Sequence, residues 1–200
     1  MNNQANQRRA AIFISFITNP ALVVSATVVV VIRAFADSQT EFWRGSAIGL
    51  GLLILPALLY SAFIWRKEGY VDIDISERRD RIVPLMLASL GAIIGAYLVQ
   101  TKLSNQTFAE MSFILVTLLM TLTLVTTIWK ISLHAATLSA LSSLLVLYRG
   151  EVFALGYLFL PLIFWSRLSL KQHTKWQLIA GTLVGAGLTF ASAWFFRTTN

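Results

Sequence analysis

The sequence predicts an all-α protein: a polytopic integral membrane bundle of about six to seven transmembrane helices. The 200 residues are 56% hydrophobic and 12% charged, whereas soluble domains average about 25% charged residues. The hydrophobic residues gather into runs that approach the roughly 20 residues needed to cross a bilayer. Cysteine is absent, which excludes disulfides and thiolate chemistry. We therefore expect a helical domain that is solvated by lipid.

The first apolar run follows a polar tail, residues 1–9, and extends from Ala10 to Ile32. A secretory signal peptide is the alternative interpretation, because Ala34–Ala36 (AFA) has the form of a cleavage site. The run exceeds the roughly 7–15 residues of a signal core, and Arg33 interrupts the approach to that site. We therefore expect this run to be a retained span.

Six further apolar runs complete a single transmembrane domain over residues 10–197. We expect Pro56 to kink the second run, because neighbouring helices can accommodate such a kink in a membrane. Pairs of glycines four residues apart predict close contacts between helices at Gly45/Gly49, Gly91/Gly95 and Gly181/Gly185. The six runs are residues 46–65, 82–100, 109–129, 135–148, 152–165 and 176–196.

Three polar loops separate these runs at residues 66–81, 130–134 and 166–177. If all seven runs cross, the three loops and the N-terminal tail lie on one side of the membrane. That side carries eleven lysines and arginines against five on the other, so the positive-inside rule predicts a cytoplasmic site. The expected location is the plasma (inner) membrane of a prokaryote. Because the net charge of +7 is spread over short loops, it favours lipid phosphates over nucleic acid as partners.

Arginine side chains in the first polar loop are suited to phosphate oxygens, because the guanidinium presents a planar fork of donors. Arg78 and Arg81 are three residues apart and would share a face if the loop becomes helical before the third span. The alternative is that Glu77 pairs with Arg81 and that the other charges anchor the loop at the interface.

Both histidines of the chain stand at predicted helix starts on the same side. Ser132 precedes His134, and Thr174 follows His173, so each hydroxyl could cap its helix. Exposed backbone N–H groups at a helix start favour an anion and disfavour an imidazolium, so both rings would tend to be neutral. The alternative is a structural role for each histidine at the interface.

The polar stretch Ser166–Gln177 (SRLSLKQHTKWQ) resembles the third motif of the type 2 phosphatidic acid phosphatase superfamily, SRxxxxxHxxxD. Ile131–His134 (ISLH) resembles its second motif, PSGH. The Arg78–Pro84 region resembles its first motif, KxxxxxxRP. The resemblance covers about residues 66–190, with the motifs in the same order and in equivalent loops.

This resemblance implies a lipid phosphatase that works without a metal or another cofactor. His173 would attack phosphorus and form a phosphohistidine, and His134 would protonate the leaving oxygen. Gln177 stands where the family has an aspartate and would orient His173. The phosphate oxygens would be held by Arg167, Ser132, Lys130 and one or both of Arg78 and Arg81.

Two other functions stay open. One is a non-catalytic membrane protein that binds lipid phosphates, because Ile131 and Leu133 replace the proline and glycine of the second motif. The other is an intramembrane prenyltransferase that binds magnesium diphosphate through Asp72, Asp74 and Asp80. Such enzymes need a second acidic cluster, and the other loops on this side contain no aspartate or glutamate.

Overall fold

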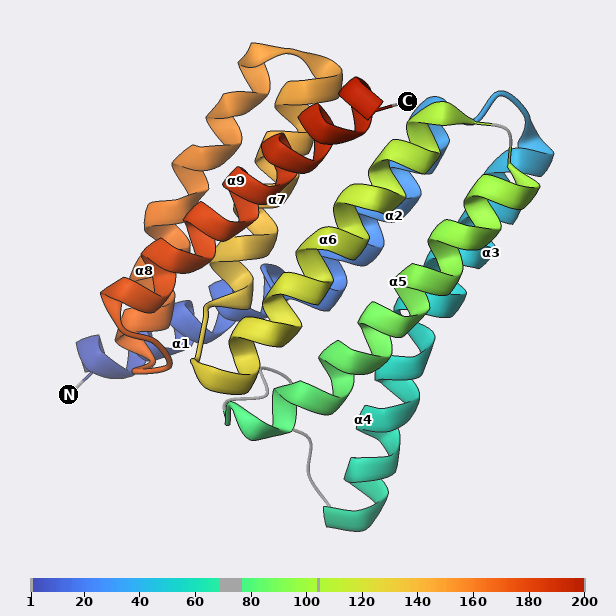
Figure 1. Cartoon of the computed structure of the whole chain (residues 1–200). Helices are drawn as coiled ribbons and strands as arrows, with labels where there is room; N and C mark the ends of the chain where they lie inside the picture. The colour runs from blue at the N-terminus through green and yellow to red at the C-terminus, as the bar shows by residue number, and fades with distance from the viewer. Residues whose placement is uncertain (1, 69–76, 104, 200) are drawn as a thin grey trace. The chain divides into compact units, whose positions relative to one another are not determined.

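A computed structural model describes residues 2–68, 77–103 and 105–199, and every regular element in these ranges is a helix (Figure 1). Contacts divide the chain into two compact units. The first unit comprises Met1–Val24 and Lys130–Ala191, and the second comprises Ser25–Trp129 and Ser192–Asn200. The predicted all-α fold class is confirmed.

Five helical segments in the described ranges are long and apolar enough to cross a membrane, and a bent pair makes six if it crosses as one span. The remaining predicted span is α7, Leu133–Arg149, whose 17 residues reach about 26 Å against a hydrocarbon core of about 30 Å. The protein is therefore an integral membrane protein by helix length and composition. The five segments are Gln4–Phe35, Arg79–Lys102, Gln106–Ile128, Glu151–Ser169 and Lys175–Thr199.

The first predicted run differs from expectation because it is interrupted. Helix α1 is Asn2–Ile17 and helix α2 is Pro20–Phe35. Pro20 has no N–H to donate, and the N–H of Ala21 donates to Asn19 Oδ1 (3.0 Å) rather than to a carbonyl of the preceding turn. An asparagine–proline pair thus ends one helix and caps the next.

The first unit contains three consecutive helical segments that pack beside one another. Helix α7 is followed by a 3-10 helix, η2 (Glu151–Phe159), which continues into α8 (Leu160–Ser169), and α9 (Lys175–Thr199) comes next and belongs to this unit as far as Ala191. Helix α7 packs against both η2 and α8, and α8 also packs against α1. Figure 1 shows the start of α7, the end of α8 and the start of α9 at one end of this unit.

A short sixth span was predicted, and the 3-10 geometry of η2 explains how it can still cross. A 3-10 helix rises about 2.0 Å per residue against about 1.5 Å in an α-helix. The 19 residues from Glu151 to Ser169 therefore extend about 33 Å, which exceeds the hydrocarbon thickness. Helix α7 lies close to η2, because a Cβ on Gly156 would lie 2.6 Å from Ser142 Oγ.

The second unit holds the end of α2 together with α3 (Gln39–Leu53), α4 (Leu55–Glu68), η1 (Arg79–Arg81), α5 (Ile82–Lys102) and α6 (Gln106–Ile128). The predicted kink is confirmed: α3 and α4 meet at Ile54, and Pro56 lies in the first turn of α4. A Cβ on Gly91 would collide with the carbonyl of Leu52, so the predicted close contact at this glycine is also confirmed.

Candidate functional site

The start of α7 is capped by Ser132, as predicted. Its Oγ accepts a hydrogen bond from the N–H of Ala135 (3.4 Å), and its side chain is fully buried. The backbone N–H of Ser132 donates to the carbonyl of Gln177 (3.2 Å). The second and third predicted loops, although 45 residues apart at these positions, are therefore joined directly.

The start of α9 forms a capping box. The N–H of Gln177 donates to Thr174 Oγ1 (3.4 Å), and Gln177 Oε1 accepts from the N–H of Thr174 (3.1 Å). This reciprocal arrangement satisfies two backbone donors that the helix itself leaves without acceptors. It also confirms Thr174 as the predicted cap.

Gln177 also determines which nitrogen of His173 carries a proton. His173 Nδ1 lies 3.1 Å from the same Oε1 atom. A backbone N–H can only donate, so the Gln177 atom that contacts Thr174 is the oxygen. His173 Nδ1 must then be the donor, so any basic nitrogen of this ring is Nε2. The side chain of His173 is buried, 6% exposed.

Arg167 lies in the last turn of α8 and has no exposed surface. Its Nη1 donates to Ser15 Oγ of α1, and the neighbouring Ser166 Oγ donates to the carbonyl of Ala11 (2.7 Å). An ionised side chain within a membrane protein is costly to bury and marks a functional site by default. Arg167 is thus the strongest single indication of a site in the first unit.

A left-handed residue connects Arg167 to His173. Lys171 has φ = 54°, and the N–H groups of Gln172 and Lys171 donate to the carbonyls of Arg167 and Leu168 (both 3.0 Å). This pair of bonds is a Schellman motif, which ends a helix and reverses the chain. The turn brings His173 back toward the end of α8.

His134 has the opposite proton arrangement to His173. Its Nε2 lies 3.2 Å from the carbonyl oxygen of Ser15. A carbonyl can only accept, so His134 Nε2 carries a proton. The ring is buried, 4% exposed. The two histidines therefore donate through different ring nitrogens, His173 through Nδ1 and His134 through Nε2.

Helix α9 approaches the backbone of α7 at the predicted glycines. A Cβ on Gly181 would lie 2.5 Å from the carbonyl oxygen of Ser132, and one on Gly185 would collide with the carbonyl of Ala136. The predicted contact at this pair is confirmed. Because His134 follows Ser132 by two residues, the packing of α9 positions the start of α7.

The first unit has a large excess of positive charge. Its sequence contains a single carboxylate residue, Glu151, which is exposed in η2 at the other end of the η2–α8 segment. A bound anion at the buried end would offset this excess. The lysines and arginines of the unit are Arg8, Arg9, Lys130, Arg149, Arg167, Lys171 and Lys175.

The other predicted phosphate-binding residues are placed differently. Lys130 is partly exposed in the loop before α7. Arg78 and Arg81 belong to the second unit, and η1 confirms that their loop is helical where it enters α5. Arg78 Nη1 donates to the carbonyls of Thr126 (2.9 Å) and Thr127 at the end of α6, and Arg81 is buried. Arg78 therefore caps a helix C-terminus.

The acidic residues of the prenyltransferase alternative fall partly outside the described residues. Asp72 and Asp74 lie in the range 69–76, which the structure does not describe, and Asp80 is exposed in η1. Within the described ranges, no group of three or more histidine, aspartate or glutamate side chains is arranged to hold a metal ion.

Ser15, which contacts both His134 and Arg167, is not among the residues predicted from the sequence. The available signal was the small or polar stripe Ala11, Ser15 and Asn19 within a run of isoleucine and phenylalanine. All three residues are buried; Ala11 and Ser15 lie one turn apart on the same face of α1, and Asn19 follows the end of this helix at the same spacing.

The chain matches no protein-family model, no curated protein and no solved structure.

Proposed function

We propose that this protein is a metal-independent membrane phosphatase that hydrolyses a lipid phosphate or diphosphate through a phosphohistidine. The observation that supports it best is the complementary hydrogen bonding of the two histidines in one unit. With its Nδ1–H held by Gln177, a neutral His173 would present a basic Nε2 as the nucleophile, and a His134 imidazolium would donate its Nε2 proton as the general acid.

The proposed reaction has two steps, formation of the phosphohistidine and its hydrolysis. The lone pair of His173 Nε2 attacks phosphorus, the bond from phosphorus to the lipid oxygen breaks, and His134, as an imidazolium, gives its Nε2 proton to that oxygen and becomes neutral. Water then attacks the phosphohistidine, His134 takes a proton from it, and the P–N bond breaks to release phosphate. Arg167 holds phosphate oxygens and stabilises the charge that develops in each transition state.

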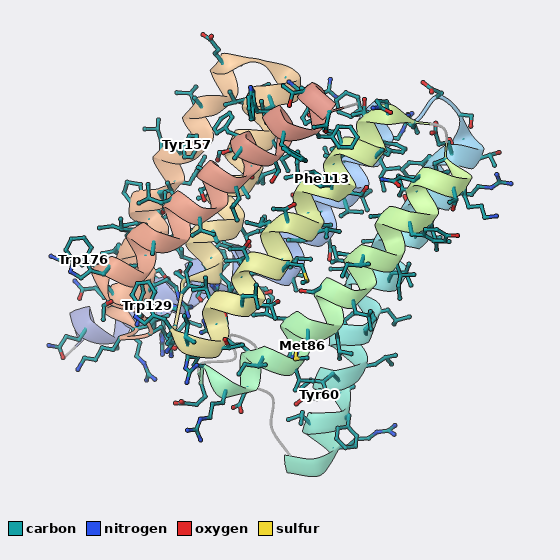
Figure 2. All side chains as sticks on the ribbon, in the orientation of Figure 1. Tyr60, Met86, Phe113, Trp129, Tyr157 and Trp176 are labelled. Carbon is teal, nitrogen blue, oxygen red and sulfur yellow. The ribbon has the colours of Figure 1, made fainter. Side chains whose placement is uncertain are left out.

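A lipid is the favoured substrate class because the site lies at the ends of membrane helices. Trp176, at the start of α9, is 73% exposed and extends away from the helix (Figure 2). Exposed tryptophans mark the membrane–water interface, so a phosphate headgroup would lie at the depth of this helix start. By the positive-inside rule, we assign this end of the unit to the cytoplasmic side.

The direct test is phosphate release by purified protein from short-chain phosphatidic acid and from an isoprenyl diphosphate, with EDTA present. We expect activity in wild type and a loss of at least about 100-fold in His173→Ala and Arg167→Ala, because each removes a group required in the transition state. Wild-type turnover by either folded variant contradicts the mechanism.

A second function, binding without turnover, is favoured by one observation. Ser15 engages Arg167 and His134 in the described structure, so both groups already have protein acceptors. Lipid-phosphate binding by the wild type, with no phosphate release from either substrate, would favour this function.

A further inference from the structure

Ser15 contacts the same two groups that a phosphate would need. Its Oγ accepts from Arg167 Nη1, and its carbonyl oxygen accepts from His134 Nε2 (3.2 Å). In the proposed reaction, Arg167 must hold a phosphate oxygen, and His134 must direct its Nε2–H at the leaving oxygen. The His134 proton cannot be directed at Ser15 and at a substrate oxygen together, so the substrate must displace Ser15 before it can react.

We propose that α1 is a gate whose Ser15 occupies the place of the substrate phosphate, and that a lipid phosphate enters by displacing α1 toward the bilayer. This inference rests on the proposed function for the identity of the ligand. Ser15 itself is 3% exposed, and Ala11, one turn earlier, has no exposed surface. The closed gate therefore covers the buried end of α8.

The outer face of α1 is suited to movement within lipid. Ile12, Phe13, Phe16 and Ile17 are between 48% and 63% exposed, so this face is apolar and directed away from the unit. Displacement of α1 sideways keeps these side chains in hydrocarbon and costs no apolar hydration. A lipid could therefore enter from the bilayer while its headgroup reaches Arg167.

The connection between α1 and α2 provides a hinge. The N–H of Ala21 bonds to the Asn19 side chain, and Pro20 has no N–H, so the helical ladder is interrupted at this junction. Few loop or helix-terminal residues are needed to absorb the backbone change of such a hinge. Helix α1 can thus move without unfolding α2.

The first experiment compares the binding of inorganic phosphate and of short-chain phosphatidic acid to wild type, Ser15→Ala and Thr18→Ala. Thr18 is the matched control, because its Oγ1 bonds within α1 to the carbonyl of Ile14 (2.7 Å). Loss of a competing hydrogen bond to a charged group should tighten both ligands about tenfold in Ser15→Ala. Thr18→Ala should bind like wild type.

Ser15→Asp should have the opposite effect, because a carboxylate beside Arg167 holds the gate closed. We expect phosphate binding to weaken about tenfold or more, with the variant melting no lower than Ser15→Ala. Should Ser15→Asp fail to fold, Ser15→Ala and the labelling experiment below still decide the question.

A labelling experiment follows the movement itself. The chain has no cysteine, so Ser15→Cys introduces a single thiol, and Ser139→Cys, fully buried in α7, is the control. Phosphatidic acid should increase maleimide labelling of Ser15→Cys several-fold and leave Ser139→Cys unchanged. Equal labelling of Ser15→Cys with and without the lipid overturns the gate.

The remaining outcomes separate the gate from the phosphatase. Tighter binding by Ser15→Ala without turnover in any variant supports the gate and removes the catalytic function. Unchanged or weaker binding of both ligands by Ser15→Ala overturns the gate. Tighter binding of phosphatidic acid alone also overturns it, because the obstruction would then lie at the lipid tail. A fall in kcat at unchanged KM also overturns it, because Ser15 would then be a positioning residue for Arg167.

Discussion

At the residue scale, Gln177 shows how an amide can take part of the role of a carboxylate. Its oxygen accepts from His173 Nδ1 and from the N–H of Thr174, so one atom both caps α9 and fixes Nδ1 as the donating nitrogen of the proposed nucleophile. A neutral amide stabilises an imidazolium less than a carboxylate does. Gln177 therefore orients the proposed nucleophile without placing a negative charge beside it.

We expect Gln177→Ala to lower turnover about 10- to 100-fold, the usual cost of removing a group that orients a reactive histidine. Gln177→Glu keeps an acceptor oxygen at the same chain length and should restore most of that turnover. The measurement is kcat in EDTA together with the melting temperature, since loss of the cap alone costs about 1 kcal/mol. Equal turnover in Gln177→Ala and wild type would show that Gln177 has only the capping role.

The partner of Arg78 could not be identified from its residue type. The sequence suggested a phosphate ligand, and the structure shows a guanidinium that donates to Thr126 and Thr127 carbonyls. Arginine suits both roles, since its planar fork binds carbonyl and phosphate oxygens alike. Only the folded structure distinguishes them.

We expect Arg78→Ala to lower the free energy of unfolding by about 1–3 kcal/mol, because carbonyls at the end of α6 lose a charged donor. Turnover per folded molecule should stay within a few-fold of wild type, in contrast to Arg167→Ala. Thermal unfolding and activity of the two variants in the same detergent test this expectation. Normal stability with lost turnover in Arg78→Ala would assign this residue to the phosphate instead.

At the element scale, the contact of α9 with α7 positions the candidate site. Gly181 faces the carbonyl of Ser132, whereas a Cβ added to Gly187, six residues later on the same helix, would meet no atom within 4 Å. The two glycines therefore form a matched pair for testing whether stability and turnover require the close contact of α9 with α7 or simply a glycine in α9.

We expect Gly181→Ala to lower both stability and turnover, because the added Cβ must push the Ser132 carbonyl and the start of α7 away. Gly187→Ala should leave turnover unchanged and stabilise α9 by up to about 1 kcal/mol through helix propensity. Melting temperatures and kcat of both variants are the measurement. Identical behaviour of the two variants would contradict the positioning role of this contact.

Most of the helices and helix caps could be predicted from the sequence, and the features that could not be predicted have physical causes. Apolar runs gave the helices, and the hydroxyls of Ser132 and Thr174 gave the caps, because both are local properties. The break at Asn19 and Pro20 was also local and was missed inside a long apolar run. Ser15 could not be identified as a partner of Arg167, because their contact depends on how α1 packs on α8.

At the scale of the whole molecule, the first unit has exposed residues at both ends of a segment that is long and apolar enough to cross a membrane. Thr174 is exposed in the loop before α9, and Glu151 is exposed at the start of η2. The η2–α8 segment between them is long enough to span. The absence of cysteine makes each position accessible to single-thiol labelling.

We expect an impermeant maleimide to label Thr174→Cys only from the cytoplasmic side and Glu151→Cys only from the opposite side, because the site end carries the excess of positive charge. Right-side-out and inside-out membrane vesicles provide the comparison. Labelling of both positions from the same side would contradict a crossing by η2 and α8.

The most direct test of the proposed function is to trap phosphate on the protein. Wild type mixed with a lipid phosphate that is radiolabelled on phosphorus, and quenched within one turnover, should carry an acid-labile, alkali-stable label that maps to His173. His173→Ala should carry none. Product formation by the wild type without any labelled protein, or an equal label on His173→Ala, would contradict the phosphohistidine mechanism.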